Sequence, residues 1–239
     1  MKKVFSWPAL LLLLVIVTTS CTKENSCIRG NNDIATETLD LPSFEGIDFR
    51  LPGNVRVIKG TQPSIVIKAS DNHIDLIRAE VRSGDLVIDT DNRCLRNTKI
   101  DITVTTPSFN YLRVAGSGDM ITDAFTVTNA KLKVDGSGSI NADVNGEEIE
   151  ATISGSGDIQ LAGSAENFKP IISGSGDIKA YNLTSKDVQA RISGSGKIQT
   201  RVSGKLNATI AGSGDVFYKG NPTSINTSIS GSGRVAKGD

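Results

Sequence analysis

The chain has 239 residues, of which 38% are hydrophobic and 22% charged, a composition that excludes a disordered chain and is sufficient for a packed core. Its 26 basic residues balance its 26 acidic ones, so the net charge predicts no binding to nucleic acid and no electrostatic attraction to an anionic membrane. The 24 glycines exceed the usual share, and most of them recur at regular intervals.

Residues 1–20 are typical of a bacterial lipoprotein signal peptide. Lys2 and Lys3 precede an apolar stretch from Ala9 to Val17, which as a helix is too short to cross a bilayer. Small residues end at Ser20, directly before Cys21, and this arrangement resembles the lipobox at which a cysteine is diacylated and becomes the new N-terminus. The pattern predicts a lipid anchor at Cys21; the alternative is an ordinary signal peptide with a chance cysteine.

The residues after Cys21 predict where the anchored protein resides. An aspartate at the next position holds such lipoproteins at the inner membrane, and Thr22 stands there instead, which favours the outer membrane. Lys23 and Glu24 weakly resemble the export tags of surface lipoproteins, so periplasm-facing and surface-exposed positions both stay open. We interpret residues 21–38 as the lipidated cysteine and a polar tether, with membrane contact through the lipid.

Two further cysteines, Cys27 and Cys94, remain in the mature chain. In an oxidising compartment they most simply form a disulfide, and two buried free thiols are the alternative. Two thiols and the distant His73 do not have the spacing of zinc ligands. The sequence therefore predicts no metal site and no cofactor.

A repeat of about 19 residues fills the second half of the chain. Each Gly-Ser-Gly motif follows the last by 18 to 20 residues, and the seven copies lie at 116–118, 136–138, 155–157, 174–176, 194–196, 212–214 and 231–233. A β-branched residue stands two positions before each motif: Val114, Val134, Ile153, Ile172, Ile192, Ile210 and Ile229. An apolar residue stands two positions after it: Met120, Ile140, Ile159, Ile178, Ile198, Val216 and Val235. We expect these positions to form two stacked aliphatic ladders.

This repeat predicts an all-β, right-handed parallel β-helix-like solenoid. Residues around each motif alternate as in a strand, and a unit this short must bury its apolar face against its neighbours. A propeller blade needs about 40–45 residues, and leucine-rich repeats need recurring leucines that this chain lacks. Calcium-binding nonapeptide repeats have half this period. We assign residues 39–239 to one solenoid domain, with regular repeats in 111–239.

The residue directly after each motif is a candidate ligand position. Four of the seven are carboxylates, namely Asp119, Asp158, Asp177 and Asp215. They could form an acidic stripe that binds calcium or a cationic partner. The alternative is a row of exposed turn positions whose side chains cap backbone amides. Lys197 and Arg234 occupy the equivalent positions in two other repeats. Because stacked like charges repel, these two cations favour the alternative.

Residues 39–110 lack the motif but read as short strands separated by glycines and prolines. We expect them to be irregular rungs that continue the solenoid and cap its N-terminal end; a separate small β domain is the alternative. Residues 72–82 are compatible with one short turn or helix.

The chain resembles a known family across residues 40–235. The segments that carry the resemblance are Phe44–Ile47, Val55–Gly60, Leu86–Ile88, Ile102–Pro107 and the Gly-Ser-Gly-Asp series. Together they resemble the head GIN domain family of putative auto-transporter adhesins. The resemblance implies a β-helix-like fold on a secreted or lipid-anchored protein, and it brings no catalytic residues.

Catalytic motifs are scarce. His73 is the single histidine, no nucleophile elbow accompanies it, and we expect it in a surface loop. The enzymatic alternative, by analogy with β-helix polysaccharide lyases and hydrolases, rests on Asp85, Asp89, Asp91, Arg93 and Asp101. Aromatic residues for a sugar platform are few, with Tyr111, Tyr181 and Tyr218 as the tyrosines. The prediction is a non-catalytic binding or structural protein of the cell envelope that contacts a glycan or a partner protein.

Overall fold

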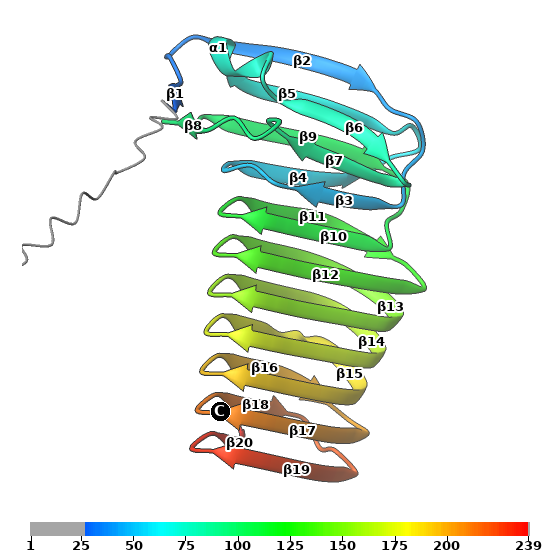
Figure 1. Ribbon diagram of the computed structural model, residues 1–239. Helices are drawn as coiled ribbons and strands as arrows, with labels where there is room; N and C mark the ends of the chain where they lie inside the picture. Colours follow the sequence, from blue (N-terminus) through cyan, green and yellow to red (C-terminus); the bar gives the residue numbers. More distant parts are fainter. Residues whose placement is uncertain (1–26, 239) are drawn as a thin grey trace, which may run out of the picture.

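The seven Gly-Ser-Gly turns lie one above another along one edge of a β-solenoid (Figure 1). The structure is a computed structural model that describes residues 27–238.

Strands that end at a turn form what we call the first layer: β10 (Tyr111–Gly116), β12 (Asn129–Gly136), the later halves of β13 (Ser139–Gly155), β14 (Asp158–Gly174) and β15 (Asp177–Gly194), then β17 (Lys205–Gly212) and β19 (Ser224–Gly231). Strands that begin after a turn form the second layer: β11 (Asp119–Thr126), the early halves of β13, β14 and β15, then β16 (Lys197–Val202), β18 (Asp215–Lys219) and β20 (Arg234–Lys237).

Successive rungs pair in parallel, and the register confirms both predicted ladders. In the first layer Ile153 pairs with Ile172, and Ile172 with Ile192. In the second layer Ile159 and Ile178 stack in the same way. These side chains are almost completely buried between the two layers, because alternate strand residues point inward and each rung covers the next.

Two more two-stranded rungs extend the solenoid at its N-terminal end, and their order in space differs from the order of their strands in the chain. β3 (Gly46–Phe49) and β4 (Asn54–Lys59) lie directly on β10 and β11. β7 (Asp85–Asp89) and β9 (Ile100–Thr106), which come later in the sequence, lie beyond them. The chain therefore passes the β3–β4 rung on its way from β9 to β10 (Figure 1).

Antiparallel strands cap this end. β5 (Ser64–Ser70) pairs with β9, β6 (Arg78–Arg82) with β7, and β2 (Ile34–Asp40) with β5. The interpretation of residues 21–38 as a plain tether needs correction, since β2 and the short β1 (Ile28–Arg29), which pairs with β8 (Leu95–Arg96), belong to the fold. Residues 1–26, including Cys21, lie outside the described residues.

The opposite end of the solenoid differs. Within residues 27–238 no strand covers β19, and its two isoleucines, Ile225 and Ile229, are each 42% exposed. Ladder residues in the inner rungs, such as Ile172 and Ile192, are buried. The N-terminal end is thus closed by paired strands, whereas the last rung presents a free strand edge.

A disulfide joins Cys27 to Cys94, with a Cα–Cα distance of 4.5 Å, beside the β1–β8 pair. His73 lies next to this junction, in the short helix α1 (Asp71–Ile74), and the expectation of a surface loop histidine is wrong because the side chain is fully buried. Its Nε2 lies 3.0 Å from the carbonyl oxygen of Ile28, so that nitrogen donates to β1. The cap, and not a surface loop, therefore holds this residue. In the part of the chain that the structure describes, no helix is long and apolar enough to span a membrane.

Replacing both Cys27 and Cys94 by Ser should lower the free energy of unfolding by about 2–4 kcal/mol, since the disulfide closes a long loop in the unfolded chain. The sequence separation of the two cysteines is 67 residues. Urea denaturation followed by circular dichroism measures the loss, and the wild type under reducing conditions is the control. A midpoint that neither reduction nor substitution changes would contradict the prediction.

Candidate functional site

The residues that follow the turns form one continuous row on the outward face of the second layer. The pairing of successive strands sets its order: Asp101, Asn54, Asp119, Ser139, Asp158, Asp177, Lys197, Asp215 and Arg234. All four carboxylates that the sequence singles out lie in this row, which we call the turn row. Asn54 and Asp101 join it from the two N-terminal rungs, so the row runs across nine rungs.

Carboxylates of the turn row accept hydrogen bonds from the next rung. The backbone N–H of Asp177 donates to Asp158 at 3.2 Å, and that of Lys197 donates to Asp177 at the same distance. The amide of Arg234 donates to Asp215 in the same way. These contacts agree with the interpretation that the side chains cap backbone amides, although each one serves the adjacent rung. The second oxygen of Asp158 pairs with Lys179 at 2.7 Å, and that of Asp215 lies 3.5 Å from Arg234, so cations on the same face partner part of the row.

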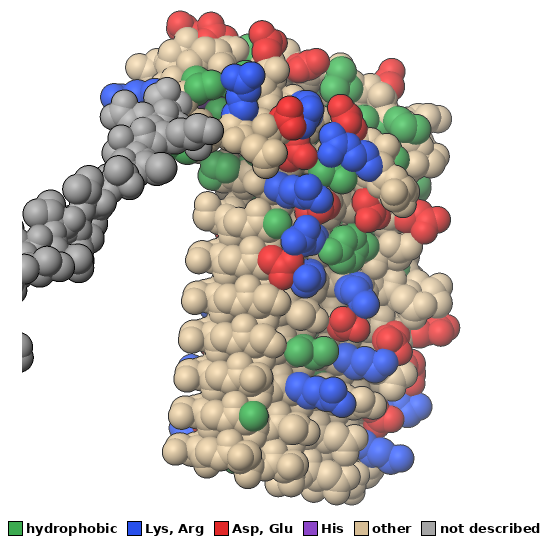
Figure 2. Space-filling view, viewed as in Figure 1, with side chains coloured by type: hydrophobic (Ala, Val, Ile, Leu, Met, Phe, Trp, Pro, Cys, Tyr) green, Lys and Arg blue, Asp and Glu red, His purple; other side chains and the backbone are tan. Residues whose placement is uncertain are grey.

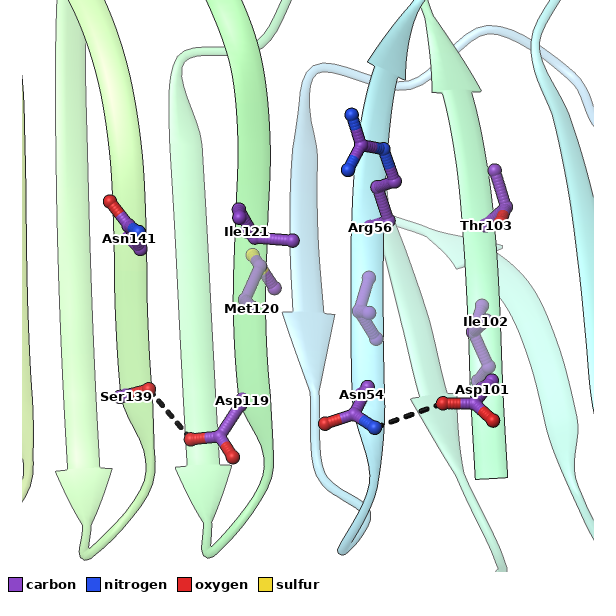
Figure 3. A pocket seen from close by; sticks show the side chains of 11 residues that line it. Asn54, Arg56, Asp101, Ile102, Thr103, Asp119, Met120, Ile121, Ser139 and Asn141 are labelled. Carbon is purple, nitrogen blue, oxygen red and sulfur yellow. Dashed lines mark hydrogen bonds between the residues drawn. The ribbon is translucent and has the colours of Figure 1, made fainter. Parts of the chain in front are cut away.

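A shallow depression of about 330 Å³ lies at the N-terminal end of the turn row (Figure 3). Two pairs from the row border it, since Asn54 donates to Asp101 at 2.9 Å and Ser139 donates to Asp119 at 2.6 Å. Ile121, two residues beyond Asp119 on β11 and beside Arg56, also lines the depression and is 42% exposed (Figure 3). The depression therefore offers hydrogen-bonding groups beside an apolar side chain, which suits a sugar or an extended peptide better than a compact cofactor.

The five residues of the enzymatic alternative do not come together. Asp89 lies within 4 Å of Arg78 and Arg82 on β6, and Asp91 pairs with Arg78 at 2.5 Å. Asp101 stands on the other layer, beside Asn54. Asp89 and Asp91 therefore share Arg78 as a partner, whereas Asp101 lies apart from both on the other layer.

Asp85 is the remaining carboxylate of that set. Burial raises its pKa, and the nearby carboxylates of Asp48 and Glu45 raise it further. It lies over Gly46, since a Cβ at that glycine would overlap the Asp85 carboxylate. The missing side chain at position 46 therefore makes the space that Asp85 occupies.

The sequence does not predict a charge network on the first layer, the face on which acidic and basic side chains lie intermixed in Figure 2. Arg113 lies between Asp48 and Asp135, at 3.2 Å and 2.8 Å, and Arg50 pairs with Asp48 at 2.6 Å. Burial alone would raise the pKa of the Asp135 carboxyl, but hydrogen bonds from Lys133 and Arg113 outweigh it and lower that pKa. Because the acids and bases neutralise one another, we interpret the network as a structural one. Within residues 27–238 no three His, Cys, Asp or Glu side chains are grouped as a metal site.

These features define a two-layered β-solenoid whose outward faces carry polar side chains in register. The chain belongs to the family described as "Putative auto-transporter adhesin, head GIN domain", whose model matches residues 43–222. The match confirms the resemblance that the sequence motifs indicate. No curated protein matches the chain.

Several solved structures share the fold. A Bacteroides fragilis protein described as a putative adhesin is 27% identical, with a TM-score of 0.82, and the match covers 88% of this chain and 99% of that one. A Parabacteroides distasonis protein described as a putative lipid binding protein is 25% identical, with a TM-score of 0.74 and coverages of 89% and 99%. A putative adhesin from Parabacteroides merdae, at 21% identity, a TM-score of 0.71 and the same coverages, shows the fold alone. The family and the first of these structures associate the fold with adhesins.

Proposed function

We propose that this protein is a lipid-anchored, non-catalytic binding protein of the cell envelope that contacts an extended glycan or an envelope protein. The turn row carries this proposal, because it holds nine side chains at one fixed position per rung, and all nine bear an oxygen or a nitrogen on the outward side of a flat layer. Rungs repeat about every 4.8 Å, so the row matches an elongated ligand that presents polar groups at short, regular intervals. Family membership supports an adhesin-like role.

A glycan array and a polysaccharide-cleavage screen with the purified protein test this proposal together. We expect retention of at least one glycan without turnover, with binding weakened by Asn54→Ala and Asp119→Ala at the edge of the depression. Asp143→Ala, on the same layer but outside the turn row, is the matched control. Turnover of a polysaccharide that is lost in Asp101→Asn would favour the enzymatic alternative and overturn the proposal.

Anchoring through Cys21 has its own expected result. In the source strain the mature protein should carry acyl groups on Cys21 and should fractionate with the outer membrane. Cys21→Ala should leave an unprocessed or soluble form, because the acylated thiol is then lost. Intact mass spectrometry and membrane fractionation measure both. A mature wild-type mass without acyl groups would exclude this anchor, and protease treatment of whole cells distinguishes surface from periplasmic exposure.

A further inference from the structure

The net charge of the chain is zero, but its acidic and basic residues are distributed unevenly along the solenoid. Residues 27–186 carry 16 basic and 22 acidic side chains, a net charge of −6, whereas residues 187–238 carry seven basic and two acidic ones, a net charge of +5. The positive segment is the last part of the stack, at the end opposite to β1 (Figure 1). The argument from net charge against polyanion binding therefore does not apply to this end.

Ion pairing changes at the same place. Before residue 187, Arg56, Lys169 and Lys186 are examples of basic side chains paired with a carboxylate. Between residues 187 and 238, Arg234 is the one basic residue with a carboxylate of the described chain within 4.0 Å, namely Asp215 at 3.5 Å. The cations of the last rungs are thus largely left for a partner outside the chain.

Four of these cations lie together on the second layer. Lys197 and Arg201 come from β16, Lys219 from β18 and Arg234 from β20. The register places Lys219 beside Arg201, and Asp215 stands between Lys197 and Arg234. Lys197 and Arg201 alternate with the buried Ile198 and Val202 and point outward, and Lys219 and Arg234 occupy the same rows of the layer. Along the strand the two ends of this group are about 13 Å apart, and rungs are about 4.8 Å apart.

Two aromatic rings hold cations in this group without neutralising them. Lys219 Nζ lies 4.6 Å from the centre of the Tyr181 ring, and the Arg234 guanidinium lies 5.3 Å from that of Phe217. Arg201 donates through Nε to the backbone oxygen of Tyr181 at 2.8 Å, which fixes the guanidinium and leaves its terminal nitrogens to donate outward. Such contacts reduce the entropy that a long side chain loses when it binds an anion. We call these four cations and two rings the distal basic patch.

We propose that the distal basic patch binds an acidic polysaccharide through its carboxylate or sulfate groups. The inference rests on the proposed binding function and assigns it a ligand class and a place. Arginine and lysine form charge-assisted hydrogen bonds to such groups, and a flat face with fixed cations suits a polymer that carries an anion every one or two sugar rings.

Competing ligands fit the patch less well. Single-stranded nucleic acid is bound by stacking bases on open aromatic faces, but on both rings of the patch a cation already covers a face. A bilayer surface is bound by protruding apolar side chains beside basic ones, and Phe217 is only partly exposed, with Arg234 over its ring. The patch also lies at the end of the solenoid away from β1, so an anchor at the N-terminus would direct it outward (Figure 1).

Binding to polygalacturonate, measured by isothermal titration or biolayer interferometry, tests the proposal. The fully methyl-esterified polymer has the same backbone without the charge and is the ligand control. We expect binding to the acid form alone, with a steep loss of affinity between about 50 and 200 mM salt as released counterions and screening weaken it. Dextran sulfate against dextran repeats the comparison for sulfate.

Matched variants locate the site. Arg201→Gln with Lys219→Gln should weaken binding about tenfold or more. Lys131→Gln with Lys169→Gln removes the same charge from the first layer and should change binding less than twofold. Circular dichroism and melting curves of both double variants establish that they are folded.

The outcomes separate this inference from the proposed function. Equal weakening by both double variants, tighter binding to single-stranded DNA or to phosphatidylglycerol vesicles than to polygalacturonate, or no binding to either acidic polymer would overturn the inference. In the last case, retention of neutral glycans on the array would leave the proposed function intact. If the array retains nothing either, the proposed function fails as well.

Discussion

Ile172→Asp should lower the free energy of unfolding by about 3–5 kcal/mol, because it places an unpaired carboxylate inside a stacked aliphatic ladder. Ile172 is completely buried and stacks on Ile153 on one side and on Ile192 on the other. Neither neighbour can donate a hydrogen bond to the new group, and its site is shielded from solvent. Urea denaturation followed by far-UV circular dichroism measures the loss.

The adjacent residue provides a matched control. Ile171 has the same side chain on the same strand, but it points outward, is partly exposed and pairs with Arg191 on the next rung. Ile171→Asp should therefore change stability by less than about 1 kcal/mol, since its carboxylate stays hydrated. Similar melting of the two variants would mean that the ladder is not a core.

The regular half of this fold could be predicted because its sequence repeats. A β-branched residue before each motif and an apolar residue after it fix which face of each strand is inward, and equal spacing fixes the register. The structure pairs Val114 with Val134 and Ile140 with Ile159, as the alignment of the repeats predicts. Local pattern and global stacking agree here, so the motif alone specifies the architecture.

The irregular half could be predicted in kind but not in order. The sequence predicts short strands within residues 39–110, but nothing local indicates that β7 and β9 lie outside β3 and β4. That arrangement depends on β5 and β6 closing the end in antiparallel pairs, which is a long-range effect. The burial of His73 has the same origin, because the capping strands place α1 against β1.

The residues of the candidate sites could likewise be predicted only in part from the sequence. The four carboxylates of the turn row follow from the motif, whereas Asn54 and Asp101 join the row through pairings with β11 and β4 that the sequence does not reveal. One feature of the sequence indicates the distal basic patch, namely the small number of acidic residues after position 187, which a count of charge by segment detects. The contact between Tyr181 and Lys219, 38 positions apart in the chain, requires the register of the rungs.

Gly174→Ala should cost more than about 3 kcal/mol, the sum of two effects at the first glycine of a turn. Its φ of +141° lies in a region that residues with a Cβ adopt only at a cost of about 1–3 kcal/mol. A Cβ at this position would also lie 2.2 Å from the carbonyl oxygen of Gly155 on the preceding rung. That same oxygen accepts a hydrogen bond from the N–H of Ser175 at 2.9 Å. A shift that relieved the overlap would therefore move the two turns apart and weaken this hydrogen bond.

Gly116 separates these two effects. It is the first glycine of the first turn, with a φ of +130°, but a Cβ there would meet no atom within 4 Å because no Gly-Ser-Gly turn precedes it. Gly116→Ala should therefore cost about 1–2 kcal/mol for the backbone conformation alone. Denaturation midpoints of the two variants give the difference, which isolates the close approach between stacked turns. Equal losses would show that backbone conformation, and not the contact between rungs, determines why glycine stands at the start of every turn.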